Sequence, residues 1–237
     1  MSSSGSQPRS AIVRDGVAVG VATGAYGISF GAIAVAAGLS VVQACALSAL
    51  VFTGASQFAL VGVLASGGAP LSGALTALML GTRNTLYGLR LAPLLDWRGW
   101  RRVGAAQLVI DESTAMSINR GSTTDARTGF LSTGVAVFVL WNLATLGGAL
   151  AGRALGDPRT YGLDAAVGGA FLALLWPRLK DRRNQVVAVL GAALALGLVP
   201  VTAAGVPVLA AALVALVAGT VSRKEDPTEY PPEGEHR

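Results

Sequence analysis

The sequence has little charge: 13% of its 237 residues are Asp, Glu, Lys or Arg, whereas a soluble domain uses roughly 25%. The deficit is concentrated in three stretches without any charged residue, which are 16–82, 129–152 and 184–222. Apolar runs of about 18 residues or more are typical of helices that cross a membrane. A soluble enzyme and a disordered chain are therefore both excluded.

Cysteine and histidine are each present once. Cys45 lies in an apolar run and has no second cysteine with which to form an intrachain disulfide. His236 lies in the polar tail, so a histidine-based metal site or a Ser-His-Asp triad within the membrane is excluded. The stretch 27–31 fits the G-x-S-x-G motif of hydrolases but lacks a general base. We expect no catalytic residue, no metal and no cofactor.

The net charge of +5 would favour nucleic-acid binding in a soluble protein. Here the basic residues form short clusters between apolar runs, as is typical of loops held at a cytoplasmic face. The clusters are Arg98, Arg101 and Arg102; Arg178, Lys180, Arg182 and Arg183; and Arg223 with Lys224. We therefore expect the lipid bilayer, and no nucleic acid, as a partner.

Eight apolar segments follow one another: 16–38, 41–66, 70–95, 103–120, 129–152, 164–179, 184–200 and 204–221. They predict an all-α polytopic membrane protein with about seven to eight transmembrane helices, since about 20 residues span a bilayer core. The short or polar segments 103–120, 164–179 and 184–200 are expected to be tilted, broken or half-spanning. We predict a cytoplasmic segment over 1–15, a transmembrane domain over 16–222 with an uncleaved first span, and a disordered tail over 223–237.

The orientation in the membrane leaves two alternatives open. Eight crossings from a cytoplasmic N-terminus place 178–183 inside but 96–102 outside, against the positive-inside tendency. A re-entrant 41–66 would bring 96–102 inside and would move the later loops outside.

Glycines recur with G-x-x-x-G spacing in the first apolar segment. They are Gly16, Gly20, Gly24, Gly27 and Gly31, and Gly148 with Gly152 repeats the spacing. Bilayer helices approach closely along such stripes, so we expect a close interface within the chain or with a partner. Ser40 and Asp164 each follow Gly-Leu and are predicted to be helix N-caps. The similarity between these two short stretches leaves open whether the chain contains an internal repeat.

Polar residues near the middle of 41–66 are candidates for a binding site. Gly54, Ser56 and Gln57 would be poor choices for a helix that faces lipid. Local unwinding at Gly54 would free backbone groups for a polar substrate, as in the discontinuous helices of transporters. The alternative is a helix–helix contact held by Ser56 and Gln57.

Arg83 is deep enough in the next segment to be partly buried, and charges at such depth usually face a cavity or a partner. Asn84 lies beside it, and Tyr87 and Arg90 follow on the same helix face. Arg90 is expected to extend to the interface. Arg83 is a candidate for substrate binding or for a structural ion pair.

Asp111 and Glu112 interrupt 103–120. On a continuous helix, one polar stripe would contain Gln107, Asp111 and Thr114, and another would contain Glu112 and Asn119. An acid at this position could pair with an arginine, bind an ammonium group or carry a proton. The alternative is an interfacial helix with solvated acids.

Several short motifs in a fixed order resemble the AzlC family, the large subunit of branched-chain amino acid exporters. They are GASQF at 54–58, Arg83 with LYGL at 86–89 and LAP at 91–93, DES at 111–113, Trp141 with Gly147 and Gly148, and YGLD at 161–164. The resemblance covers nearly the whole membrane region. It implies a multi-pass protein of the bacterial inner membrane that exports valine, leucine and isoleucine together with a small AzlD-type membrane subunit.

The chain departs from this pattern just before the LYGL stretch. The family pattern is similar to Asn-x-Arg-His, whereas this chain has Gly81, Thr82, Arg83 and Asn84. The arginine is kept, and the position of the histidine is taken by Asn84. A proton-coupling role of that histidine would therefore be unfilled here.

We expect a midplane cavity between 41–66, 70–95 and 103–120. Gln57 and the backbone around Gly54 would hold polar groups of the amino acid substrate. Arg83 would bind its carboxylate, Asp111 or Glu112 would bind its ammonium group, and Asn142 could offer a further hydrogen bond. The alternatives are a transporter of another small apolar amino acid such as methionine, and a membrane scaffold that transports nothing.

Overall fold

The computed structural model describes residues 8–118, 120–155, 172, 175–202 and 206–222, and within these ranges every regular element is a helix. The all-α prediction is confirmed to that extent. The chain divides into unit 1, Met1–Ala173, and unit 2, Leu174–Arg237. The motif at 161–164 with its predicted N-cap Asp164, most of the segment 164–179 and the tail 223–237 lie outside the described residues.

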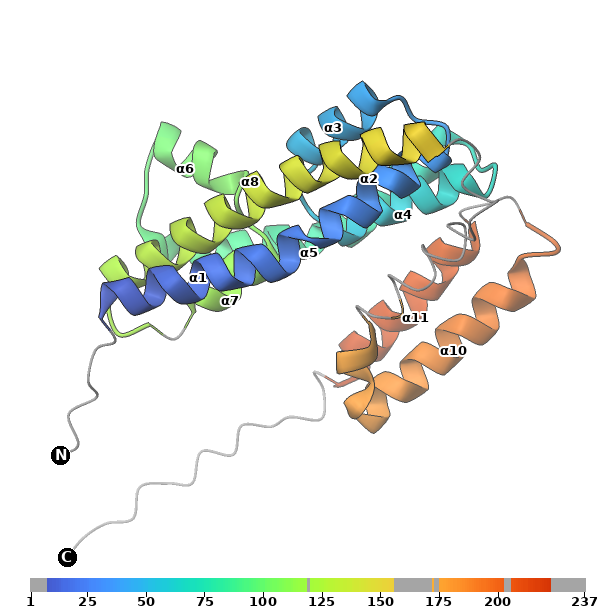
Figure 1. The fold of residues 1–237 in the computed structure, drawn as a ribbon. Coiled ribbons are helices and arrows are strands. Elements are labelled where there is room, and N and C mark those ends of the chain that lie inside the picture. Colours follow the sequence, from blue (N-terminus) through green and yellow to red (C-terminus); the bar gives the residue numbers. More distant parts are fainter. Residues whose placement is uncertain (1–7, 119, 156–171, 173–174, 203–205, 223–237) are drawn as a thin grey trace, which may run out of the picture. The chain divides into compact units, whose positions relative to one another are not determined.

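Unit 1 is built on three helices, α1 (Arg9–Gly24), α2 (Tyr26–Ala36) and α8 (Thr123–Leu155). Helices α1 and α2 follow each other with a break at Ala25, and together they lie along α8 (Figure 1). The runs Arg9–Ala36 and Thr123–Ala154 are the two that are long and apolar enough to cross a membrane among the described residues. Because α1 begins at Arg9, residues 9–15 of the predicted N-terminal segment are helical.

The glycine stripe faces α8, so the predicted close interface lies within the chain. A Cβ atom at Gly20 would be 2.5 Å from the Ala136 Cβ, and one at Gly24 would be 2.6 Å from the Leu140 Cβ. On the opposite helix, Gly148 gives the same room to the backbone of Ile28. Helices without a side chain at the contact can pack backbone to backbone, which is how bilayer helices associate closely.

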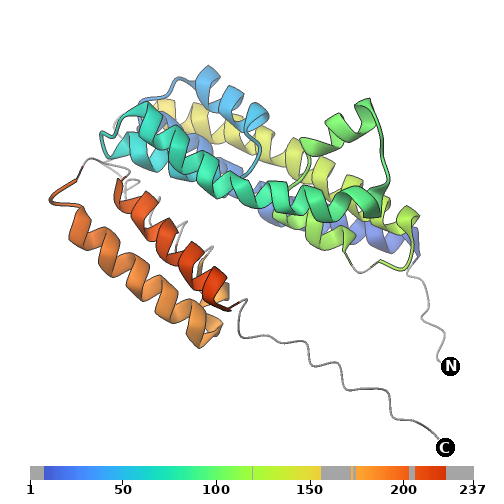
Figure 2. The ribbon, with the colours of Figure 1, turned by 180° about the vertical axis from the view of Figure 1, so that it is seen from behind.

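The segment 41–66 forms two short helices, α3 (Val41–Leu50) and α4 (Ala55–Ala65), so the local unwinding that was one alternative for Gly54 is present. Ser40 caps α3 as predicted: its Oγ accepts from the Gln43 N–H at 3.2 Å. The turn 36–38 before α3 and the turn 64–67 after α4 line one common pocket. The segment therefore enters and leaves at the same end of unit 1, which agrees with the re-entrant alternative (Figures 1 and 2).

The segment 103–120 is also broken, as expected, into α6 (Trp100–Ala106) and α7 (Asp111–Ser117). The predicted stripe of Gln107, Asp111 and Thr114 does not form, because the helix is interrupted between Gln107 and Asp111.

Between the two broken segments runs α5 (Pro70–Leu95), a continuous helix of 26 residues. Its last carbonyls are satisfied by Arg127 of α8, whose Nε donates to the Leu95 carbonyl at 2.7 Å and whose Nη2 donates to the Asp96 carbonyl at 3.1 Å. The same guanidinium lies over the Trp97 ring, 5.7 Å from its centroid. Arg127 thus fixes the end of α5 to α8.

Aromatic rings connect the short helices α3 and α4 to the helices α2 and α8. Phe30 of α2 stacks on Trp141 of α8, and Phe58 of α4 meets both rings edge-on, with centroids 5.5 and 6.2 Å apart. Phe52, in the break between α3 and α4, packs edge-on against Phe138 at 5.0 Å. The break therefore has fixed apolar neighbours.

Large aliphatic side chains point away from unit 1, as expected for a surface in contact with lipid. Exposed examples are Val21, Leu71, Leu86, Leu143 and Leu150.

Unit 2 contains η2 (Trp176–Lys180), α10 (Arg182–Leu198) and α11 (Val206–Ser222), so the predicted segment 184–200 is helical up to Leu198 and 204–221 is helical over its described residues. Asp181 caps α10 by accepting from the Arg183 N–H at 3.0 Å. The Arg183 side chain donates to the Ala218 carbonyl of α11 at 2.5 Å.

The number of times the whole chain crosses the membrane stays a prediction.

Two neighbouring glycines of α8 test the close packing. Gly148→Ala places a methyl group against the backbone of Ile28, which a packed helix pair can accommodate only by moving apart. We expect this overpacking to lower the stability by about 1–3 kcal/mol. The matched control is Gly147→Ala, since nothing lies within 4 Å of a Cβ at Gly147.

The readout is the melting temperature of the monodisperse protein in detergent. Gly147→Ala should leave it unchanged or raise it, because alanine stabilises a helix interior by roughly 0.5–1 kcal/mol relative to glycine. Equal melting temperatures for the two variants would contradict the packing described here.

Candidate functional site

The two helix breaks of unit 1 meet each other. Gln107, in the break between α6 and α7, donates from Nε2 to the carbonyl of Ala49 near the end of α3, at 2.7 Å. Ile110, just before α7, lies in the same buried apolar cluster as Phe52 from the other break. Segments about 60 residues apart in the sequence therefore form one polar region lined by interrupted backbone.

Gly54 makes the first break possible. Its φ of 62° and ψ of −91° lie where residues with a Cβ are strained, and it immediately precedes α4. Gln57, fully buried in the first turn of α4, holds the two half-helices together. Its Oε1 accepts from the Gly54 N–H at 3.3 Å, and its Nε2 donates to the Leu47 carbonyl of α3 at 3.0 Å. Both ends of the Gln57 amide are thus engaged within the chain.

Arg83 connects the two breaks from the middle of α5. Its Nη1 lies 3.0 Å from Asp111 Oδ2, at the start of α7, and its Nη2 donates to the Thr53 carbonyl in the first break at 3.4 Å. Arg83 is about 20 Å along the helix axis from Pro70 and about 18 Å from Leu95. The ion pair that was one alternative for Arg83 is therefore present, and it lies at the middle of a helix long enough to cross a bilayer core.

Several polar atoms around this ion pair are buried without a hydrogen-bond partner in the structure. They are Ser56 Oγ, Arg83 Nε, Asn84 Oδ1, Asp111 Oδ1 and Thr114 Oγ1. A buried donor or acceptor without a partner costs about 1–3 kcal/mol, and native proteins leave few of them. The remaining two such side-chain atoms in the described residues, Thr133 Oγ1 and Trp141 Nε1, belong to α8. The concentration beside Arg83 indicates a site that is completed by a polar ligand.

A cavity of about 660 Å³ lies between α3, α4 and α5. Its polar wall contains Thr53, Ser56 and Gln57, and its remaining walls are mainly aliphatic, with Leu47, Leu60, Leu75, Leu78 and Met79. Volumes of about 300–1,000 Å³ with mostly apolar walls and a few polar groups are typical of small-molecule sites. The cavity thus offers apolar space next to the residues of the first helix break.

The predicted site residues Glu112 and Tyr87 lie near the Arg83–Asp111 pair. The Glu112 carboxyl interacts with the side chain of Thr23 in α1 and lies near Asp111 and Arg83. Tyr87 is half-buried one turn after Arg83 on α5.

Asn142 donates from Nδ2 to the carbonyl of Phe138, one turn earlier in α8, at 2.8 Å. Its amide is used locally, and no hydrogen bond of the described residues joins it to the polar group around Arg83.

Two contacts of the site could not be predicted from the sequence: the hydrogen bond from Arg83 to the Thr53 carbonyl and the one from Gln107 to the Ala49 carbonyl. Both acceptors belong to the backbone, so no residue type indicates them.

Comparison with known proteins gives two matches. The family model described as AzlC protein matches residues 18–155, which include both helix breaks, Arg83 and Asp111. An uncharacterized membrane protein of Archaeoglobus fulgidus is 33% identical over 187 residues, which cover 78% of this chain and 82% of that protein. No solved structure matches.

The role of Gln57 can be tested against that of Gln43. Gln57→Glu keeps the acceptor for the Gly54 N–H but replaces the donor to the Leu47 carbonyl by a second acceptor, inside the protein. We expect a loss of stability of about 1–3 kcal/mol or more. Gln43→Glu should be tolerated, because the Gln43 side chain only accepts from the Ser40 N–H and a capping box takes glutamate equally well.

Thermal unfolding of the two variants in detergent provides the comparison. Similar melting temperatures for Gln57→Glu and Gln43→Glu would show that Gln57 does not hold the break.

Proposed function

The chain belongs to the AzlC family of membrane proteins, and on this premise we propose that it is a multi-pass transporter subunit that exports branched-chain amino acids. Valine, leucine and isoleucine are the proposed substrates. The proposed setting is a bacterial inner membrane, with a small AzlD-type subunit as partner. The observation that carries the proposal is the incompletely hydrogen-bonded Arg83–Asp111 pair near the middle of α5, beside an apolar cavity.

The two charges suit the two charges of an amino acid. Arg83 Nη1 lies 3.0 Å from Asp111 Oδ2. The Nε of Arg83 is still a free donor, and the Oδ1 of Asp111 is still a free acceptor. A substrate carboxylate can accept from Arg83, and a substrate ammonium group can donate to Asp111. Hydrogen bonds between ionised groups are shorter and stronger than neutral ones, so this pair favours a zwitterion over a neutral molecule.

The start of α4 adds donors for the carboxylate. Ser56 is 1% exposed, lines the cavity and has no partner for its hydroxyl. The N-terminal end of an α-helix carries a partial positive charge, which favours an anionic group nearby. Discontinuous helices at mid-membrane present such helix ends to the substrate in other transporters. In this proposal Gln57 supports the break and leaves substrate contact to Ser56 and Arg83.

The cavity walls select the substrate side chain. Burial of each methylene group contributes about 0.8 kcal/mol, so a branched aliphatic side chain gains more here than that of glycine or alanine. A charged side chain would lose its hydration against the walls formed by Leu60, Leu75 and Leu78. The size of the cavity also accommodates methionine, which a competition assay distinguishes from the branched substrates.

Substrate binding also changes the link between the half-helices. Arg83 holds Thr53 before α4 and Asp111 in α7 in the structure. A zwitterion that inserts between the charges separates these two segments. Binding is thereby coupled to movement of the interrupted helices, which an alternating-access transporter needs.

The proposal predicts a specific loss in Arg83→Ala. Without the guanidinium, the substrate carboxylate has no cationic partner and Asp111 is left unpaired, so flux of labelled valine in proteoliposomes should fall to background. The matched control is Arg90→Ala, which removes the same charge from an exposed position two turns later on α5. Arg90→Ala should transport valine as the wild type does.

Both variants are reconstituted with the AzlD-type subunit and checked for equal amounts of assembled protein. Wild-type flux in Arg83→Ala would remove Arg83 from the mechanism. Absence of flux in the assembled wild type, for every amino acid and imposed gradient, would favour the scaffold alternative.

A further inference from the structure

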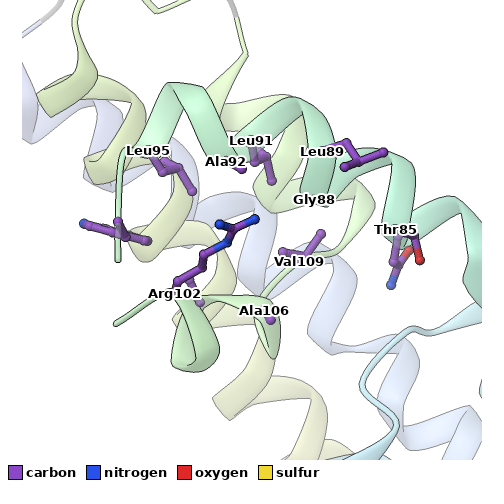
Figure 3. Close-up of a pocket in the computed structure, with 12 residues that line it drawn as sticks. Thr85, Gly88, Leu89, Leu91, Ala92, Leu95, Arg102, Ala106 and Val109 are labelled. Atoms are coloured by element: carbon purple, nitrogen blue, oxygen red, sulfur yellow. The ribbon is translucent and has the colours of Figure 1, made fainter. Parts of the chain in front are cut away.

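A second cavity, of about 430 Å³, lies between α5 and α6 (Figure 3). It uses the second half of α5, from Asn84 to Leu95, whereas the cavity beside α4 uses the first half, from Ala74 to Thr85. The two cavities therefore lie on opposite sides of the level of Arg83 along α5. Thr85 lines both of them, which makes them neighbours at that level.

Arg102 gives the second cavity a positive charge. Its side chain extends from α6 into the cavity toward Leu91 and Ala92 of α5 (Figure 3). No acidic residue is among the described residues that line this cavity. Arg102 is itself exposed, and with no carboxylate beside it in the cavity its fork of donors favours an anionic group.

One end of the cavity is formed by the residues of α5 that directly follow Arg83. Asn84 follows Arg83 directly in α5, lines the second cavity and keeps a buried Oδ1 without a partner. A polar ligand that moves between the cavities passes Asn84 and Thr85, and both offer hydrogen bonds there. The remaining wall, with Leu91, Leu95 and Val109, is aliphatic.

We propose that this cavity is a second binding station for the transported amino acid, in which Arg102 binds the carboxylate and the aliphatic wall binds the side chain. The inference rests on the proposed function and extends it, because the substrate then occupies one station on each side of the Arg83–Asp111 pair. An anionic lipid could offer Arg102 the same negative charge. The position of Asn84 next to Arg83, and of Thr85 in the walls of both cavities, favours the amino acid.

Valine counterflow distinguishes the station from the central site. The full chain is reconstituted with the AzlD-type subunit in neutral phosphatidylcholine, and Arg102→Ala is compared with Arg101→Ala. Both arginines are exposed, and of the two only Arg102 lines the cavity. Loss of one charged hydrogen-bonding partner should raise the half-saturating valine concentration about tenfold in Arg102→Ala. The maximal rate should stay within about twofold, as expected when a binding contact outside the rate-limiting step is lost.

Occupancy of the cavity is measured independently of transport. In a Cys45→Ala background, Ala106→Cys places a thiol on the cavity wall, and Gly104→Cys places one at an equally exposed position of α6 that does not line the cavity. Valine should slow reaction of a thiol reagent at position 106 and not at position 104. This protection should disappear when Arg102→Ala is added.

The outcomes separate the proposals. If wild-type counterflow is normal but Arg102→Ala behaves like Arg101→Ala and valine protects neither thiol, the second station is refuted and the proposed function stands. An effect of Arg102→Ala that is present only when phosphatidylglycerol is added to the vesicles would assign the cavity to lipid and refute the station. Absence of valine counterflow in the assembled wild type would refute the proposed function and the station with it.

Discussion

A helix that stops within an apolar layer leaves backbone carbonyls and N–H groups without partners, and unit 1 is arranged to supply those partners. The carbonyls at the end of α3 and in the break that follows receive hydrogen bonds from three side chains of three different segments. Gln57 of α4 reaches Leu47, Gln107 reaches Ala49, and Arg83 of α5 reaches Thr53. The interrupted backbone and the polar side chains thus require each other, which explains why both occur together in an otherwise apolar chain.

The helices α1, α2 and α8 form a framework beside the interrupted helices, and their close contacts are made at glycines. Helices α1, α2 and α8 pack through glycines with backbones almost in contact, which leaves little space between them. The half-helix α3 is fastened to this framework by the hydrogen bond from Ser48 to Thr145, at 3.2 Å, and the break by the Phe52–Phe138 contact. A closely packed framework beside interrupted helices suits the proposed transport, which requires the site to change while its support does not.

Sequence patterns predict the local features of this structure and miss the distant contacts. The glycine spacing indicates a close interface, the Ser40 cap follows from residue type, and Gly54 with its polar neighbours indicates unwinding. The pattern does not reveal that α8 is the partner of the glycine stripe, nor that Arg127 satisfies the end of α5, because neither contact has a local signal. The length and hydropathy of 41–66 also satisfy the rule for a continuous span, so the sequence leaves open whether the unwinding at Gly54 occurs, and the structure shows that it does.

The central claim is that the Arg83–Asp111 pair binds a zwitterion. Calorimetric titration of the purified complex with valine, isobutylamine and 3-methylbutanoate tests it most directly, because the last two compounds keep the branched side chain and lack one charged group each. The account predicts that valine binds at least about tenfold more tightly than either analogue, since each loses one charge-assisted contact. An analogue that binds as tightly as valine would contradict it.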